Sequence, residues 1–185
     1  MPGEGRPLVL ASASPQRRAI LERLGVSFTV RPAAVEELTH GDPETVALEN
    51  ARRKAAAVAA SEPQAALVLG VDTLVVLDGE ILGKPVDAEH ATRTLALLQG
   101  RTHRVVSGLV LTGVGTRVEI TEVTFRTLDA ERISRYVALG EWRGRAGGYA
   151  VQESGGALVR RIEGDYVNVV GLPVGALLDL LPDLL

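Results

Sequence analysis

The sequence predicts an α/β fold with a mixed central sheet. Short apolar runs rich in valine and leucine alternate along the chain with longer segments whose apolar residues recur at a helical period. A β-α-β unit begins the chain, with a strand, a helix and a second strand expected at residues 8–13, 15–24 and 27–31. The pair Asp78-Gly79 indicates a tight turn between two further strands. Parallel and antiparallel neighbours are therefore expected in one sheet.

The remaining elements follow from the same signals. Asp42-Pro43 starts an alanine-rich helix, roughly 44–60, and Lys54 can project from one face of it. Residues 65–77 are too rich in β-branched side chains for a favoured helix and predict a buried strand. Other helices are expected at 88–99, 129–139 and 173–184, other strands at 80–82, 102–112, 116–126, 149–152, 157–162 and 166–170, and a glycine-rich loop at 140–148.

Composition limits the class of protein. A chain of 185 residues with 46% hydrophobic content can fill the core of one large domain or of two small lobes. The absence of cysteine excludes disulfides, thiolate catalysis and cysteine-based zinc sites. A net charge of −3, with no alternation of basic and aromatic residues, argues against a nucleic-acid polymer as partner. Because no signal peptide or membrane-length apolar run is present, we expect no membrane partner and a cytoplasmic location.

The segment after the first strand predicts an anion-binding site. Ser14 is a good N-cap, and Pro15 suits the first helical turn because its missing N–H leaves no bond unmade there. The free N–H groups at the helix start lie at the positive end of the helix dipole, where phosphate oxygens bind readily. Arg17 or Arg18 can add charge-assisted hydrogen bonds. The alternative is an ordinary capped helix with solvated arginines.

Asp72 lies within an otherwise apolar strand and is the second candidate. A buried carboxylate is costly to desolvate unless a metal, a cation or hydrogen-bond donors compensate it. Glu36 or Glu37, in a loop after the second strand, would complete with Asp72 an oxygen-rich site suited to Mg²⁺. The alternatives are that Gly70 interrupts the strand and lets Asp72 cap a turn, and that the two glutamates are merely solvated.

The two lysines of the chain lie beside these candidates. Lys54 is on the alanine-rich helix, and Lys84 stands between a glycine and a proline that hold its ammonium in one direction, unless it is a plain surface residue. No P-loop, dinucleotide fingerprint, nucleophile elbow or histidine metal spacing is present. The candidate residues are a helix start with an arginine, two lysines and two or three carboxylates. Together they are suited to binding a polyphosphate and a divalent metal. A nucleoside triphosphate is therefore the expected ligand.

Five motifs, taken in order, resemble those of the Maf family, the septum-formation-inhibitor-like nucleotide pyrophosphatases, over nearly the whole chain. They are Leu10-Ala-Ser-Ala-Ser-Pro-Gln-Arg-Arg18, the segment 71–85, Gly100-Arg-Thr-His-Arg-Val105, Ala146-Gly-Gly-Tyr-Ala-Val-Gln152 and the segment 164–173. The resemblance implies one domain over residues 1–185, with a mixed, curved central sheet, helices on its faces and two lobes around a substrate cleft, as in Maf and inosine triphosphatase-like proteins. It also implies a homodimer.

The resemblance further implies metal-dependent hydrolysis of a nucleoside triphosphate to the monophosphate and pyrophosphate, at the α–β phosphoanhydride. By position, the implied roles are phosphate binding by Ser14, Arg17, Lys54 and Lys84, and metal binding and water orientation by Glu37 and Asp72. The metal is expected to be Mg²⁺, with Mn²⁺ and Co²⁺ as alternatives. Asp72 is the expected base, and the two lysines join the two carboxylates as catalytic residues because they stabilise the charge that develops on attack at the α-phosphorus.

Within the family, Asp72-Thr73 and the motif that ends at Gln152 resemble the branch acting on dTTP and UTP, and modified pyrimidine nucleotides are further candidate substrates. Gln16 departs from that pattern, because the branch commonly has arginine there; we expect Gln16, Thr73 and Gln152 to contact substrate. A second branch usually has Asp-Gln instead of Asp-Thr. The alternatives are therefore a methylated-guanosine triphosphate pyrophosphatase and a non-catalytic nucleotide-sensing regulator of septum formation.

Overall fold

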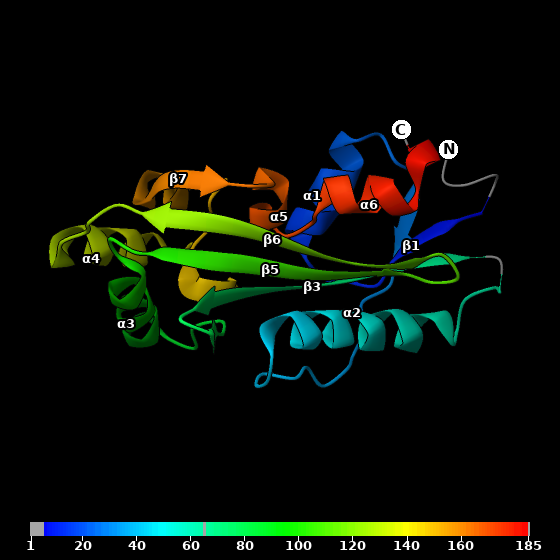
Figure 1. The fold of residues 1–185 in the computed structure, drawn as a ribbon, viewed down its shortest axis with the longest axis horizontal. Helices are drawn as coiled ribbons and strands as arrows, with labels where there is room; N and C mark the ends of the chain where they lie inside the picture. The colour runs from blue at the N-terminus through cyan, green and yellow to red at the C-terminus, as the bar shows by residue number, and fades with distance from the viewer. Residues whose placement is uncertain (1–5, 65, 185) are drawn as a thin grey trace. The chain divides into compact units, whose positions relative to one another are not determined.

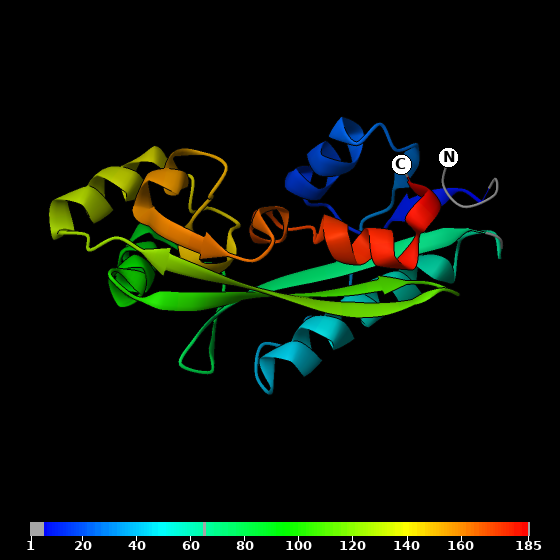
Figure 2. The same ribbon diagram turned by 45° about the horizontal axis from the view of Figure 1, so that its top comes forward.

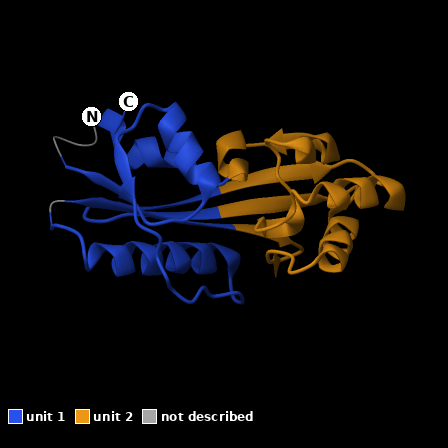
Figure 3. Cartoon of the chain, turned by 180° about the vertical axis from the view of Figure 1, so that it is seen from behind, with its two compact units in different colours: residues 1–73, 107–119, 171–185 blue, residues 74–106, 120–170 orange. Residues whose placement is uncertain are grey.

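The computed structural model of the chain describes residues 6–64 and 66–184 and divides into two compact units (Figure 3). Unit 1 comprises the chain up to Thr73, residues Ser107–Glu119 and the chain from Gly171 onward, and unit 2 comprises Leu74–Val106 and Ile120–Val170. Seven strands of the described residues form one sheet in the order β2-β1-β3-β5-β6-β7, with β4 paired to β3. The predicted α/β class is confirmed.

In unit 1, the predicted β-α-β unit is present and its strands are parallel. β1 pairs in parallel with β2 on one side and with β3 on the other, while β3 pairs antiparallel with β4, so the sheet is mixed as predicted. The bounds of these elements are β1 Leu8–Leu10, α1 Pro15–Arg23, β2 Phe28–Val30, α2 Pro43–Ala59, β3 Leu67–Leu77 and α6 Val174–Leu180. Ala65, the expected first residue of the β3 strand, lies outside the described residues.

Helix α2 packs closely on one face of the unit 1 strands, while α1 and α6 lie on the other face (Figures 1 and 2). The close approach depends on two glycines. A Cβ added at Gly70 in β3 would lie 2.2 Å from the carbonyl oxygen of Ala51, and one added at Gly108 would lie 2.4 Å from that of Ala47. Because both obstacles are helix backbone, neither can move without displacing α2, and this helix therefore keeps a fixed position over β3.

Replacing Gly70 with alanine should consequently push α2 away from β3. We expect the free energy of unfolding to fall by about 2 kcal/mol, the usual cost of overpacking a core, and catalysis to weaken because α2 carries Lys54. Urea denaturation of the variant measures the first effect. Gly175→Ala is the matched control, since a Cβ there meets nothing within 4 Å. Equal stability of Gly70→Ala and wild type would contradict this explanation of the close approach.

Unit 2 begins in the second half of β3 and continues through the predicted hairpin. Asp78 and Gly79 both have positive φ, 52° and 87°, and connect β3 to β4. Its core contains buried side chains of strands and helices, among them Leu95, Phe125 and Ile133. The other bounds are β4 Glu80–Leu82, α3 Ala88–Leu98, β5 Thr102–Leu111, β6 Gly115–Phe125, α4 Ala130–Leu139, β7 Val159–Glu163 and α5 Tyr166–Val170.

Two predicted strands are wrong. Residues 149–152 form no strand, because the Ala150 N–H donates to the Tyr136 hydroxyl and the Ala150 carbonyl accepts the N–H of Glu153 in a turn. Residues 166–170 form helix α5 instead, since Asp165 accepts the N–H of Val167 on its carboxylate and that of Val169 on its carbonyl. A bond from the distant Tyr136 thus decides the backbone of the first segment, and local bonds to Asp165 override the β-branched composition of the second.

The last predicted helix, 173–184, is interrupted. Helix α6 ends at Leu180, and a 3-10 turn at Pro182–Leu184 follows it. Pro182 explains the break because it disfavours helical geometry in the residue before it and supplies no N–H. Among the described residues, no helix combines the length and apolarity that crossing a membrane would require.

Candidate active site

The candidate site is built where β1 ends and α1 begins in unit 1. Ser12 and Ser14 lie in the loop between the two elements, and Ser14 forms the expected N-cap by accepting the N–H of Arg17 at 3.4 Å. The Ser14 hydroxyl also donates to the side-chain oxygen of Gln16 at 3.2 Å. Ligands of α/β sheets bind beyond the carboxyl ends of parallel strands, and this loop lies at such an end.

Arg17 is buried, and its guanidinium is held by groups from three parts of unit 1. Nε donates to the carbonyl oxygen of Gly171 (2.8 Å), Nη1 to the hydroxyl of Ser12 (2.9 Å) and Nη2 to that of Thr73 (3.1 Å). Arg18, in contrast, is exposed and pairs with Glu22 at 2.7 Å. The alternative of solvated arginines therefore describes Arg18 and not Arg17.

The charge of Arg17 is not neutralised by direct contact with a carboxylate, because its three hydrogen-bond partners are all neutral. Burial lowers its pKa below the ordinary arginine value, and the negative charges of Asp72 and Glu37 oppose that shift. A guanidinium has five N–H donors, so donors remain after these three bonds. Arg17 is thus a fixed cation with hydrogen-bonding capacity left for an anion.

Asp72 and Glu37 meet at a single ammonium group. Lys54 Nζ lies 2.6 Å from Asp72 Oδ1 and 2.5 Å from Glu37 Oε1. Asp72 is buried within β3, whereas the Glu37 side chain is 37% exposed. The sequence-based expectation that one loop glutamate lies near Asp72 agrees with this geometry, and Glu37 is that residue.

Strand β3 continues without interruption through Gly70, so Asp72 does not cap a turn. The absence of a Cβ at Gly70 serves the packing of α2 and not a break in the strand. The alternative explanation of Asp72 is therefore wrong. Instead, a cation and a hydrogen-bond donor from α2 compensate the buried carboxylate: Lys54 contacts one oxygen, and Asn50 Nδ2 donates to the other at 2.9 Å.

Asn50 is the site neighbour that sequence reasoning missed. Its side chain is fully buried, and its amide contacts both Asp72 and the backbone of Leu38, next to Glu37. A signal was present in the sequence. Asn50 and Lys54 are four residues apart, so they share one face of α2, and a lone asparagine among alanines and valines on that face indicates a buried polar partner.

The two remaining predicted residues belong to unit 2. Lys84 is exposed, in the loop after β4, next to Gly83, whose carbonyl accepts the N–H of Gly147 at 3.2 Å. Gln152 is partly buried and follows the segment that begins at Tyr149. The other predicted residues lie in unit 1 and form two groups that meet at the neighbouring residues Asp72 and Thr73 of β3: hydrogen bonds link Ser14, Gln16, Arg17 and Thr73, and ion pairs link Glu37, Lys54 and Asp72.

The segment before Gln152 is held by two buried aromatic hydroxyls of unit 2. The Tyr149 hydroxyl lies 2.9 Å from His103 Nε2, and the Tyr136 hydroxyl accepts the N–H of Ala150 at 3.0 Å. Burial lowers the pKa of His103 to about 4 and raises that of Tyr149. Both groups are therefore neutral near pH 7, which suits a structural role more than proton transfer.

The donor set of unit 1 fits a hard divalent cation. Mg²⁺ prefers oxygen ligands and is commonly bound by one or two carboxylates together with substrate phosphates and water, and Glu37 and Asp72 supply two converging carboxylates. The described residues contain no cluster of three or more histidines, cysteines or acidic residues. A cation here would consequently need ligands from the substrate.

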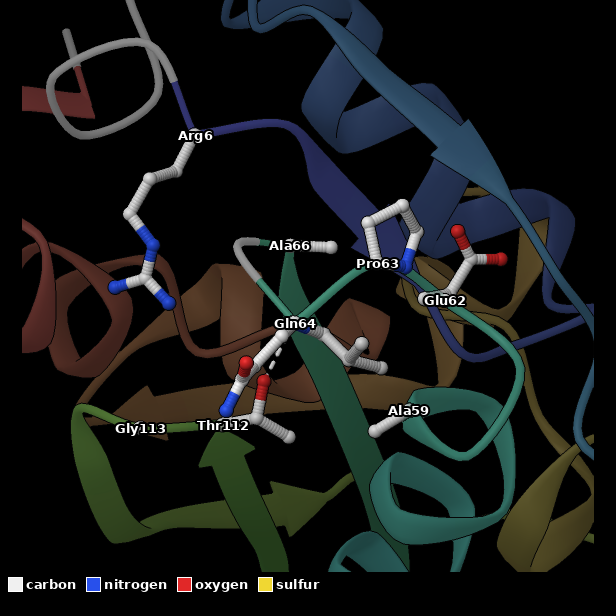
Figure 4. A pocket seen from close by; sticks show the side chains of 9 residues that line it. Arg6, Ala59, Glu62, Pro63, Gln64, Ala66, Thr112 and Gly113 are labelled. Atoms are coloured by element: carbon white, nitrogen blue, oxygen red, sulfur yellow. Dashed lines mark hydrogen bonds between the residues drawn. The ribbon is translucent and has the colours of Figure 1, made fainter.

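A pocket of about 210 Å³ lies elsewhere in unit 1 and is distinct from this site (Figure 4). It is found where β1 and β3 begin, between Arg6, Gln64 and Thr112, whereas the candidate residues follow the end of β1. Its side chains offer one arginine and one glutamate, Glu62, which pairs with Arg31 at 3.3 Å. We therefore place the candidate site at the carboxyl end of β1.

The family model described as Maf-like protein matches residues 7–184, and the chain belongs to this family. Several relatives carry the name dTTP/UTP pyrophosphatase. Those of Pelotomaculum thermopropionicum and Moorella thermoacetica are 45% and 48% identical over 183 and 181 residues, covering 95% and 94% of this chain and 95% and 93% of their own. The relative of Pyrococcus furiosus is 42% identical over 182 residues, covering 95% of this chain and 94% of its own.

Proposed function

We propose that this chain is a nucleoside triphosphate pyrophosphatase that hydrolyses dTTP and UTP to the monophosphate and pyrophosphate. Membership of the Maf family and relatives that are named for this activity and are similar over nearly their whole length support the reaction and the substrates. The observation that carries the proposal is in unit 1, where the buried Arg17 at a helix start binds Thr73 of β3, and the preceding residue of that strand, Asp72, shares the Lys54 ammonium with Glu37. In this proposal, unit 1 supplies both the cations that bind the anionic substrate and the carboxylate that acts as general base.

The phosphates of the substrate bind at the start of α1. Free backbone N–H groups and the helix dipole favour negative charge there, and Arg17 adds its remaining guanidinium donors. The Ser14 hydroxyl completes the phosphate-binding residues of unit 1, and the family resemblance makes Lys84 of unit 2 a further candidate for phosphate binding. Because neutral groups already fix Arg17, it needs little further ordering when the substrate arrives.

Asp72 acts as the base. It accepts a proton from a water molecule whose oxygen attacks the α-phosphorus, the bond from that phosphorus to the bridging oxygen breaks, and pyrophosphate leaves. Each carboxylate oxygen has two acceptor positions, so Asp72 can receive the water while Lys54 and Asn50 remain bound. The Lys54 ammonium offsets negative charge that develops on the phosphates.

A divalent cation completes the charge balance. Arg17 and Lys54 carry two positive charges, and Glu37 and Asp72 two negative ones, so these four residues leave the charge of a triphosphate uncompensated. Mg²⁺, or alternatively Mn²⁺ or Co²⁺, would be held by Glu37 and Asp72 and would polarise the phosphate oxygens when bound. We also propose a homodimer, on the family resemblance, and a cytoplasmic location, where its nucleotide substrates are present.

Steady-state kinetics on a nucleotide panel test the function. The purified protein is incubated with Mg²⁺ and dTTP, UTP, CTP or 7-methyl-GTP, and pyrophosphate release gives kcat/KM for each. The highest values are expected for dTTP and UTP. Preference for 7-methyl-GTP would place the chain in the other branch, and nucleotide binding without release from any substrate would support the non-catalytic regulator.

Gln16 tests the basis of specificity. Its side-chain oxygen accepts the Ser14 hydroxyl, and it carries no charge for a phosphate. Gln16→Arg should free that hydroxyl and add a charge-assisted hydrogen bond of about 1.5 kcal/mol, which would raise kcat/KM for dTTP and UTP about 10-fold. Gln64→Arg, an exposed position at the other end of unit 1, is the control for added charge. An unchanged kinetic profile of Gln16→Arg would remove this residue from the specificity determinants.

A further inference from the structure

Asn50 uses its whole side-chain amide within the candidate site. Its oxygen accepts the N–H of Leu38 at 2.7 Å, and its nitrogen donates to the Leu38 carbonyl at 3.0 Å and to Asp72 Oδ2 at 2.9 Å. The residue is 1% exposed. The amide thus pairs with both backbone groups of one residue, as a neighbouring strand would, while its second N–H binds a carboxylate.

The backbone that Asn50 holds carries Glu37. Residues 31–39 lie in neither a helix nor a strand; the Arg31 N–H still donates to the Leu10 carbonyl at 3.0 Å, but beyond it no ladder of strand hydrogen bonds holds this part of the described chain. Two other contacts join α2 to this segment: Lys54 Nζ pairs with the Glu37 carboxylate at 2.5 Å, and Arg53 donates to the carbonyl of Glu36 at 3.2 Å in an exposed position. The part-buried pair of bonds from Asn50 to Leu38 is therefore a contact by which α2 holds the backbone next to Glu37, whereas Lys54 holds the Glu37 carboxylate itself.

The orientation of the Asp72 carboxylate depends on the same helix face. Lys54 contacts Oδ1 and Asn50 donates to Oδ2, and the two side chains are one turn apart on α2. With each oxygen bound to a different partner, rotation of the carboxylate would break at least one buried contact. The pair thus sets the plane of the carboxylate that the proposed mechanism uses as its base.

Only an amide satisfies this position. A leucine of similar size would leave Asp72 Oδ2 and both backbone groups of Leu38 without their partner, at a cost for each buried polar group. An aspartate could still accept the Leu38 N–H, but it would place a carboxylate against Asp72 and could not donate to it. The requirement for both a donor and an acceptor distinguishes this role from simple filling of space.

We propose that Asn50 is a positioning residue, which orients the Asp72 carboxylate and fixes the Glu37 segment so that both carboxylates converge on Lys54. The inference rests on the proposed function for its kinetic consequence. Its structural part, the hold on Leu38, does not depend on any activity. The two parts can accordingly be tested separately.

The test compares Asn50→Ala and Asn50→Asp with Val58→Ala, a buried α2 residue in the apolar cluster with Val9 and Val68. Hydrogen–deuterium exchange of the peptide 36–40 and kcat and KM for dTTP are measured for each. Asn50→Ala should speed exchange of this peptide and lower kcat about 10-fold or more with KM changed less than about 3-fold, in line with a loss confined to the chemical step. Val58→Ala should lose stability while keeping both properties.

Asn50→Asp separates the two contacts. It retains the acceptor for the Leu38 N–H, so exchange of peptide 36–40 should stay closer to the wild-type rate than in Asn50→Ala, whereas kcat should still fall. Unchanged exchange in Asn50→Ala, or a loss of kcat that follows stability equally in Asn50→Ala and Val58→Ala, would overturn the inference. Absence of dTTP hydrolysis by the wild type would instead refute the proposed function, and the exchange data would still decide whether Asn50 holds the segment.

Discussion

Asp72→Asn is expected to lower kcat/KM for dTTP by a factor of about 10² or more, the usual contribution of a general base. The amide keeps the size and shape of the carboxylate but cannot take a proton from water or hold a cation. The fold should persist, because Lys54 retains Glu37 as a partner and a neutral amide is less costly to bury than a carboxylate.

The measurement is pyrophosphate release under saturating and limiting dTTP, accompanied by a thermal unfolding curve. Asp78→Asn provides a matched control, because Asp78 is exposed in the β3–β4 turn and contacts Arg101 outside unit 1. This control should retain full activity. Near-normal turnover by a folded Asp72→Asn enzyme would show that Asp72 is structural, and another base would then have to be found.

The second large effect is expected from Lys54→Met. Methionine fills the volume of the lysine stem but removes the ammonium that Asp72 and Glu37 share, so a buried carboxylate loses the cation that it contacts. Breaking a buried ion pair on one side typically costs about 3 to 5 kcal/mol. We expect the free energy of unfolding at pH 7 to fall by about 3 kcal/mol, because Glu37 is partly solvated, and turnover of dTTP to be lost.

A double-mutant cycle with Asp72→Asn identifies the cause. If the uncompensated carboxylate is responsible, Lys54→Met should destabilise the Asp72→Asn protein much less than the wild type, with an interaction free energy of about 2 kcal/mol in urea denaturation. Arg52→Met, at an exposed position of the same helix, serves as control for the loss of a helical cation. Additive effects of Lys54→Met and Asp72→Asn would mean that packing, not charge, accounts for the lost stability.

Much of the fold could be predicted because its signals are local. Three helices start at an N-cap residue that can be recognised in the sequence: α1 at Ser14 before Pro15, α3 at Asp87 and α4 at Asp129. The turn at Asp78-Gly79 requires positive φ values, which aspartate and glycine tolerate. One error, at residues 149–152, lies where a distant side chain decides the backbone. Residues 149–152 leave the sheet because the hydroxyl of Tyr136, on α4, takes the N–H of Ala150.

The candidate site was predictable in kind but not in detail. Asp72 is conspicuous because a charged residue within an apolar strand needs compensation, and Lys54 is one of only two lysines in the chain. Nothing local separates Arg17 from Arg18, since the difference arises from the carbonyl of Gly171, distant in the sequence. The contacts of Asn50 could not be predicted for the same reason, because its partners Leu38 and Asp72 belong to two other segments of the chain.

The most direct test of the central claim is to identify which phosphoanhydride bond of the substrate is cleaved. The enzyme is given dTTP and Mg²⁺ in ¹⁸O-labelled water, and the products are identified by ³¹P nuclear magnetic resonance and mass spectrometry. Attack of water on the α-phosphorus predicts equal amounts of dTMP and pyrophosphate, with the label in dTMP alone and no products from the Asp72→Asn enzyme. Formation of dTDP and inorganic phosphate, or label in the pyrophosphate, would contradict it.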